Sequence, residues 1–284
     1  MKHALKNVLL AGTAFSLACG QAFAASNEKI VSAGASVTEL IYALDAESQL
    51  VGVDVTSITP KDSSLPKVGY HRALSSEGLL ALQPTMIIGS DEMGPKTTLD
   101  QLQRIGVDIK VVNNDPTIIG LNKRIDQIAA LTHTKNRAPA LKSQVATIVK
   151  DLETNQNVEH KTKKVLFLLI HEGRPANVAG SDTTPDAIIT LAGGKNPAAA
   201  SLTSYKPISN EAIIEMQPDV VLVSGRSYAK LGGSAAIIDA LPMLSATPAG
   251  QNNAILTIDG HALVGGLGLK SLEEAKRINA LLYP

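Results

Sequence analysis

The sequence predicts an α/β protein of two similar lobes with mostly parallel sheets, joined by a long bridging helix and separated by a cleft. Three observations lead to this fold class. A helix–Gln-Pro–strand segment occurs twice, a second pair of segments repeats in the same order, and a polar, helix-favouring stretch lies between the copies. Internal duplication of this kind indicates two similar structural units.

The first duplicated segment occupies residues 77–84 and 211–218. Each copy opens on a glutamate, Glu77 or Glu211, continues with apolar residues at helical spacing and closes on Gln-Pro. The residue before a proline is pushed out of the α region, so each helix is expected to end there. The β-branched run that follows each copy predicts a buried parallel strand.

The second duplicated segment occupies residues 33–44 and 179–191. Each copy contains a strand end, a turn rich in Gly, Ser and Thr, and an amphipathic helix, with one extra residue in the second copy. Serine and threonine in such a turn can cap the helix that follows. The order of the paired segments is the same in both halves, which favours two lobes of one design.

The stretch between the copies, residues 117–158, is predicted to be helical. Leu121, Ile125 and Ile128 recur at helical spacing, and Pro139 is expected near the start of a second helix. A long helix joining two lobes is stiff and allows small rocking rather than a large hinge motion. The predicted organisation is a signal peptide (1–24), an N-terminal lobe (25–120), a bridging helix region (121–160) and a C-terminal lobe (161–284).

The first 24 residues are typical of a secretory signal. Lys2 and Lys6 precede a short apolar run, and Ala-Phe-Ala at 22–24 matches the small-residue pattern before a cleavage site. We therefore expect cleavage near Ala24 and a periplasmic location. Lipid attachment at Cys19 is the alternative, but the leucine before it lies one place too close for a good lipid-attachment site.

Removal of this segment changes the composition. Cys19 is the one cysteine, and loss of Lys2 and Lys6 lowers Lys+Arg from 26 to 24 against 26 Asp+Glu. The remaining chain would have no thiol chemistry and no basic stripe, so nucleic acid is not an expected partner. Aromatic residues become sparse, with one phenylalanine, five tyrosines and no tryptophan.

Residues 29–284 resemble the helical-backbone class of periplasmic binding proteins, which includes those for cobalamin, siderophores and haem. The resemblance rests on the Gly-x-x-x-Thr-Glu turn near the start, the duplicated glutamate helices and the bridging helix. Within it, residues 68–84 (Val-Gly-Tyr-His-Arg-Ala-Leu-Ser-Ser-Glu and onward) are similar to the haemin-binding branch, whose axial ligand is a tyrosine in this context. The resemblance implies capture of one or two haem molecules and delivery to an inner-membrane ABC permease, downstream of an outer-membrane haem receptor.

Tyr70 is the candidate ligand of the haem iron, with Arg72 beside it. A phenolate oxygen suits ferric iron, and tyrosine is an established axial ligand. In an extended loop, side chains two residues apart leave the same side, so Arg72 would assist the phenolate or bind a propionate. From spacing alone, a tyrosine that packs a loop and a solvated arginine remain open.

The opposite lobe offers further candidates at strand ends. His171 and Arg174 follow an apolar strand beginning near Phe167, and His171 would be a second axial ligand, a contact to the far face of the macrocycle or a solvated histidine. The resemblance implies that Arg226, expected in a strand-end loop, hydrogen-bonds the tyrosine or a propionate. It also implies that Glu77 and Glu211 dock onto arginines of the permease.

Other functions remain open at this stage. His71, His171 and His261 would form a metal-ion site (Zn, Mn or Fe) if they converged, although a His-rich acidic loop is missing. A cobalamin or siderophore binder is nearer, but the absent tryptophan counts against it. The sequence contains no Gly-x-Gly-x-x-Gly after a strand, no P-loop and no Gly-x-Ser-x-Gly motif, so an enzyme is not expected.

Overall fold

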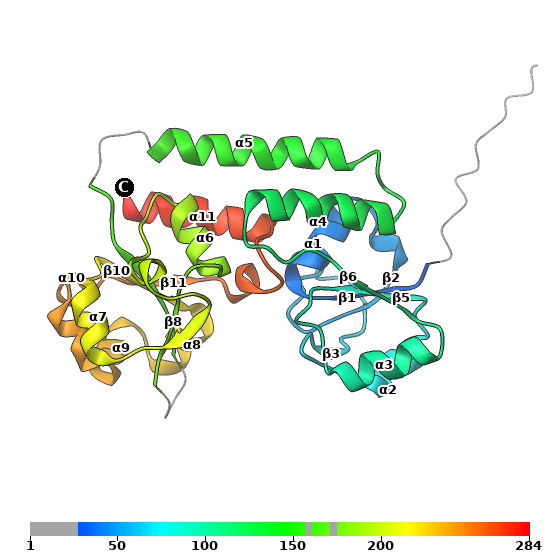
Figure 1. Cartoon of the computed structure of the whole chain (residues 1–284), viewed down its shortest axis with the longest axis horizontal. Helices are drawn as coiled ribbons and strands as arrows, with labels where there is room; N and C mark the ends of the chain where they lie inside the picture. The colour runs from blue at the N-terminus through cyan, green and yellow to red at the C-terminus, as the bar shows by residue number, and fades with distance from the viewer. Residues whose placement is uncertain (1–27, 157–160, 171–174) are drawn as a thin grey trace, which may run out of the picture.

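The N-terminal lobe is built on a four-stranded parallel sheet in the order β2-β1-β5-β6 (Figure 1). The computed structural model describes residues 28–156, 161–170 and 175–284. A two-stranded hairpin, β3-β4, lies beside the sheet at the cleft. The elements of this lobe are β1 (Ile30–Ala33), α1 (Ala35–Ala43), η1 (Glu47–Gln49), β2 (Leu50–Val53), β3 (Gly69–Tyr70), β4 (Ala73–Leu74), α2 (Ser76–Leu82), β5 (Met86–Gly89), α3 (Lys96–Arg104) and β6 (Asp108–Val111).

The C-terminal lobe contains a five-stranded sheet in the order β11-β10-β7-β8-β9. Strands β7, β10 and β11 are parallel, whereas β8 and β9 run antiparallel at one edge. The elements are β7 (Val165–Leu169), β8 (Asn177–Ala179), α6 (Thr184–Leu191), η2 (Pro197–Ala200), β9 (Tyr205–Pro207), α7 (Asn210–Met216), β10 (Val220–Ser224), α8 (Gly225–Leu231), α9 (Ser234–Ala240), η3 (Pro242–Ala246), α10 (Pro248–Gln251), β11 (Ile255–Ile258), η4 (Gly260–Leu263) and α11 (Leu269–Leu282). The predicted fold class, two lobes with mostly parallel sheets, is confirmed.

The duplicated helices α2 and α7 have the same design. Ser75 and Ser209 cap them by accepting hydrogen bonds from backbone N–H groups, at 3.1 Å and 3.2 Å. Both helices end at the predicted glutamine, which leaves the right-handed α region for the left-handed one, with φ of 48° in Gln83 and 46° in Gln217. The following strands β5 and β10 are buried, as their β-branched sequences predict.

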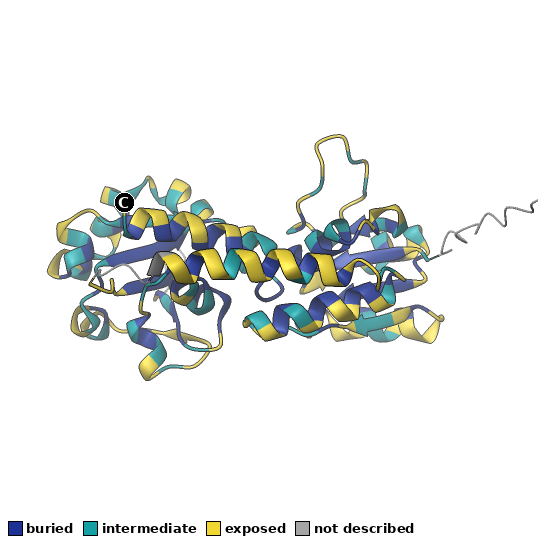
Figure 2. Ribbon diagram, turned by 90° about the horizontal axis from the view of Figure 1, so that it is seen from above, coloured by how far each residue is buried: buried dark blue, intermediate teal, exposed yellow. Residues whose placement is uncertain are grey.

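Helices α4 (Ile118–Leu131) and α5 (Ala138–Gln156) form the bridge. Pro139 is the second residue of α5, where its missing N–H costs no hydrogen bond. Figure 1 shows α5 extending above both lobes, and Figure 2 shows its exposed outer surface. The largest apolar cluster runs from Leu40 through Ile125 to Ile188, so the cores of the two lobes are continuous beneath the bridge. Among the residues described, no helix is long and apolar enough to cross a membrane.

A polar contact between the lobes supports this core. The half-buried carboxylate of Glu39 on α1 accepts hydrogen bonds from the backbone N–H groups of Leu269 and Lys270, at 2.7 Å and 3.0 Å, at the start of α11. Burial raises the pKa of Glu39 to about 7 although these N–H groups oppose the shift. Nearby, the fully buried Arg124 donates to the Leu267 carbonyl at 2.8 Å. The N-terminal lobe is thereby tied to the last helix of the other lobe.

Candidate ligand-binding cleft

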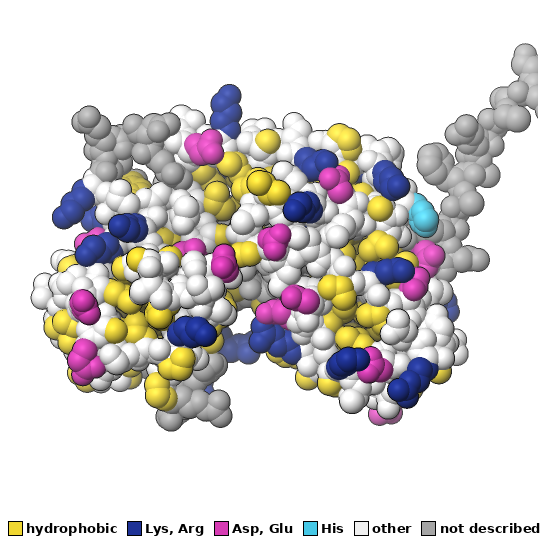
Figure 3. Space-filling model, in the orientation of Figure 1, with side chains coloured by type: hydrophobic (Ala, Val, Ile, Leu, Met, Phe, Trp, Pro, Cys, Tyr) yellow, Lys and Arg dark blue, Asp and Glu magenta, His cyan; other side chains and the backbone are white. Residues whose placement is uncertain are grey.

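A cleft of about 1320 Å³ lies between the lobes and is lined by side chains of both. Figure 3 shows Lys and Arg side chains gathered where the surface is hollowed between the two lobes. The volume exceeds the roughly 1000 Å³ at the upper end of common small-molecule pockets. The cleft is therefore large enough for a bulky ligand. Its lining includes Tyr70, Arg72, Glu92, Phe167, Tyr205 and Arg226.

Tyr70 and Arg72 belong to the β3-β4 hairpin. Gly69 adopts a φ of 100°, and a Cβ atom there would lie 2.7 Å from the carbonyl oxygen of Ala73, so the position requires glycine. Tyr70 pairs with Ala73, which leaves His71 and Arg72 as a two-residue turn. The predicted extended loop is wrong, but both Tyr70 and Arg72 line the cleft. The Tyr70 side chain is 43% exposed.

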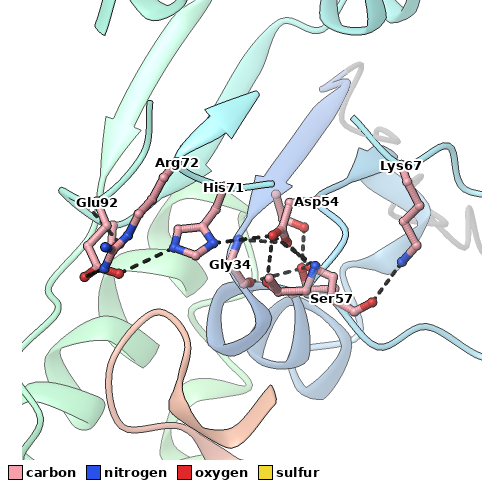
Figure 4. Close-up of polar contacts among 11 residues, drawn as sticks. Gly34, Asp54, Ser57, Lys67, His71, Arg72 and Glu92 are labelled. Atoms are coloured by element: carbon pink, nitrogen blue, oxygen red, sulfur yellow. Dashed lines mark hydrogen bonds and ion pairs between the residues drawn. The ribbon is translucent and has the colours of Figure 1, made fainter. Parts of the chain in front are cut away.

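His71 lies behind Tyr70, between two carboxylates (Figure 4). It is 2% exposed, its Nδ1 lies 3.7 Å from Asp54 and its Nε2 lies 3.5 Å from Glu92. Neither contact has hydrogen-bond geometry, so the attraction is electrostatic. Burial disfavours the charge of the ring, yet Asp54 and Glu92 together outweigh it and raise the pKa of His71. The Tyr70 and His71 ring centroids are 4.2 Å apart, so the His71 ring packs directly against the exposed tyrosine.

Asp54 fixes the inner end of this network. Its carboxylate accepts hydrogen bonds from the Gly34 N–H at 3.0 Å, the Thr56 hydroxyl at 2.6 Å and the Ser57 hydroxyl at 2.6 Å. Burial would raise its pKa, but contacts with His71, Ser57, Thr56 and Gly34 lower the pKa of Asp54 to about 2. Asp54 therefore stays ionised and favours a protonated His71.

Glu92 forms the outer end of the network. One carboxylate oxygen pairs with the Arg72 guanidinium and the other faces His71. The contact with His71 lowers the pKa of Glu92, and Arg72 adds to the shift while burial opposes it. Glu92 is thus an anion placed between the Arg72 guanidinium and the His71 ring of the hairpin. No local pattern in the sequence indicates this role, since Glu92 lies 20 residues from Arg72.

The C-terminal lobe presents an aromatic wall in which the exposed ring of Tyr205 on β9 is backed by the buried ring of Phe167 on β7. Their ring centroids are 6.4 Å apart in an edge-to-face arrangement, and both residues line the cleft. Burial raises the pKa of Tyr205 to about 12, with Glu92 and Tyr70 adding to the shift, so its hydroxyl stays protonated. Sequence reasoning missed Tyr205, although the scarcity of aromatic residues was an available signal.

Arg226 lies in the first turn of α8 rather than in a loop as predicted. Ser224 caps this helix by accepting a hydrogen bond from the Ser227 N–H at 3.2 Å, so the helix begins directly after β10. Arg226 is exposed and lines the cleft. Across the described ranges it has no hydrogen-bond or ion-pair partner, which leaves its donors open to a ligand.

The remaining predicted site residues have different outcomes. His171 and Arg174 lie outside the described residues, so their roles stay predictions. His261 lines the cleft, where its Nδ1 lies 2.8 Å from Asp259. Within residues 28–156, 161–170 and 175–284, no group of three or more His, Cys, Asp or Glu side chains is arranged to hold a metal ion. Glu77 and Glu211 are exposed on α2 and α7, outside the cleft.

Residues 30–262 match the model of the periplasmic binding protein family, and the chain belongs to that family. Among solved structures, the chain is similar to the periplasmic heme binding protein HutB of Vibrio cholerae, with 62% identity, a TM-score of 0.86 and coverage of 91% of this chain and 100% of that one. It is also similar to the periplasmic heme-binding protein BhuT in complex with two hemes, with 31% identity, a TM-score of 0.81 and coverage of 90% and 99%. A vitamin B12-binding protein of Vibrio parahaemolyticus is 24% identical over 76% of this chain and 78% of its own.

Proposed function

We propose that this protein binds haem in the cleft between its lobes and delivers it to an ABC importer. The observation that carries the proposal is the exposed Tyr70 side chain on a glycine-dependent hairpin, opposite an aromatic wall. A macrocycle entering the cleft would meet an oxygen donor for ferric iron on one side and apolar ring surface on the other. The similarity to haem-binding proteins over nearly the whole chain supports the same ligand.

The charges of the cleft suit the carboxylates of haem. Arg72 on the N-terminal lobe and Arg226 on the C-terminal lobe both reach the cleft, and a guanidinium binds a carboxylate through paired hydrogen bonds. We expect one or two haem molecules, since the cleft is larger than a common small-molecule pocket and BhuT holds two hemes. The location that fits this function is the periplasm, after signal cleavage near Ala24.

Tyr70→Phe is the variant that tests the proposal. Loss of the phenolate oxygen should weaken haemin binding by on the order of 100-fold and remove the phenolate-to-iron charge-transfer band, because the ring alone cannot ligate iron. Haemin titration of the purified protein, followed at the Soret band, measures both effects. Tyr42→Phe, which removes the same oxygen from α1 outside the cleft, is the matched control and should behave as wild type.

Cobalamin is the competing ligand, and the same titration separates the two. Cyanocobalamin at equal concentration should leave haemin binding unchanged if haem is the ligand. Displacement of haemin by cyanocobalamin, or wild-type binding by Tyr70→Phe, would contradict the proposal.

A further inference from the structure

Glu92 forms an ion pair with the Arg72 guanidinium, the group that a ligand carboxylate would bind. Its Oε1 pairs with the Arg72 side chain and its Oε2 lies 3.5 Å from Nε2 of His71, as Figure 4 shows. Arg72 has no other hydrogen-bond or ion-pair partner in the described part of the chain. A carboxylate-bearing ligand that approaches Arg72 therefore meets a carboxylate already in place.

We propose that Glu92 is an internal competitor that sets the affinity of the cleft for ligands with carboxylate groups. In the ligand-free protein Glu92 neutralises Arg72, and a ligand carboxylate takes its place when it binds. This inference rests on the proposed function, because it concerns how the same cleft binds haem. Glu92 would thus affect the affinity and selectivity of the cleft through the carboxylate charge of the ligand rather than through its iron.

The burial of the partners makes such an exchange feasible. The Arg72 side chain is 56% exposed and that of Glu92 is 33% exposed, so their ion pair is partly screened by water. Ion pairs in contact with water contribute little to stability, so a ligand carboxylate bound by the planar guanidinium can match this one. Arg72 can thus change partner at little cost.

His71 gives Glu92 a second partner after the exchange. The ring is almost fully buried between Asp54 and Glu92. A Glu92 released from Arg72 therefore keeps the His71 ring 3.5 Å from its Oε2 and is not left without a polar neighbour beside the ligand. A ligand without carboxylates gains nothing from Arg72 and leaves the Arg72–Glu92 pair intact.

Glu92→Gln tests the competition because it removes the charge and keeps the shape. The dissociation constant for haemin should fall by about fivefold, the equivalent of removing one exposed ion pair. Iron protoporphyrin dimethyl ester, which lacks free carboxylates, should bind the variant and the wild type equally. Thermal unfolding of each variant reports whether the fold is intact.

Two controls separate competition from a general charge effect. Asp91→Asn removes one negative charge at the neighbouring exposed residue, which pairs with Asn114 at 3.0 Å, and should leave haemin affinity unchanged. In an Arg72→Ala background, Glu92→Gln should not increase haemin affinity, since the guanidinium for which Glu92 and the ligand compete is absent.

Three results would overturn the inference. They are unchanged or weaker haemin binding by Glu92→Gln, an equal gain with the dimethyl ester, and a gain that survives in the Arg72→Ala background. Failure of the wild type to bind haemin would instead overturn the proposed function, and the inference with it.

Discussion

Helices α2 and α7 have nearly the same structure in the two lobes, whereas the surfaces that the two lobes present to the cleft are different. Both helices begin at a serine cap, present an exposed glutamate at their second residue and end at a left-handed glutamine. At the cleft, the N-terminal lobe pairs its cations with Asp54 and Glu92. The C-terminal lobe presents Arg226 without a partner among the described residues, together with an aromatic wall.

This contrast separates the parts of the two lobes that can serve the same role from the parts that serve different roles. A surface used in the same way by both lobes can stay the same, and a membrane partner with two equivalent docking sites would favour that. For the proposed ligand the two faces of the cleft can differ, because haem bound through its metal on one side would require only packing and carboxylate contacts on the other. The lobes are therefore alike in α2 and α7 and unlike within the cleft.

The largest expected effect concerns the shared surface. Replacing both Glu77 and Glu211 by alanine should reduce haem-dependent uptake by at least tenfold and leave haemin affinity unchanged, because both side chains lie outside the cleft. Growth with haemin as the sole iron source, together with the Soret titration, measures the two properties. The matched control replaces Glu47 and Glu215, one exposed glutamate from each lobe. Full uptake by the first double variant would show that the repeated glutamates only stabilise their own helices.

A smaller effect distinguishes the two arginines of the cleft. Arg226→Ala should weaken haemin binding by about tenfold, since a charge-assisted hydrogen bond contributes about 1.5 kcal/mol or more. Arg72→Ala should weaken it by only two- to threefold, because Glu92 already offsets the contribution of Arg72. Arg104→Ala, on α3 and outside the cleft, serves as the control. Equal losses for Arg72→Ala and Arg226→Ala would remove the proposed difference between the lobes.

The sequence predicted best what depends on local signals. The glutamate helices, their Gln-Pro ends and the strands after them follow from residues within a few positions of one another, and Pro139 marked the start of α5. The turn at Arg72 was missed because Gly69 acts through its positive φ, which the sequence does not reveal. The helix start at Arg226 was missed although Ser224, the residue that caps it, is a common capping type. Tyr70 was identified through a family resemblance and a chemical argument together.

The contacts around Tyr70 could not be predicted in the same way. Asp54, His71 and Glu92 are separated by 17 and 21 residues, and the fold alone brings them together. Tyr205 comes from the other lobe and lies 135 residues from Tyr70 in sequence. Their positions depend on the sheet order and on the way the lobes face each other across the cleft.

A further difference between the lobes lies in the second duplicated segment. Glu39 on α1 and Asp186 in the first turn of α6 occupy similar places in the two copies of this segment. Asp186 accepts a hydrogen bond from Asn196 at 2.9 Å within its own lobe, whereas Glu39 reaches across to the first N–H groups of α11. Glu39 is therefore a polar link between lobes, and the raised pKa of its half-buried carboxylate makes that link sensitive to pH.

The smallest expected effect is on stability and comes from this link. The pKa of Glu39 rises from 4.5 to about 7 on folding, so between these values the folded protein binds more protons than the unfolded chain. Its contribution to stability is therefore present below pH 4.5 and is lost as the pH rises toward 7. The charge of nearby Glu273 raises the pKa of Glu39 further, and the charge of Arg124 lowers it.

Glu39→Gln removes the titrating group, so the variant should lose less stability than the wild type between pH 5 and pH 8. The difference in the change of Tm should be about 5 °C, a typical response of a domain of this size to one or two kcal/mol. Thermal unfolding at several pH values measures it, with Glu47→Gln at an exposed position as the control. Parallel pH profiles for wild type and Glu39→Gln would mean that Glu39 stays ionised at the lobe interface, held by the N–H groups of Leu269 and Lys270, and that burial does not control its charge.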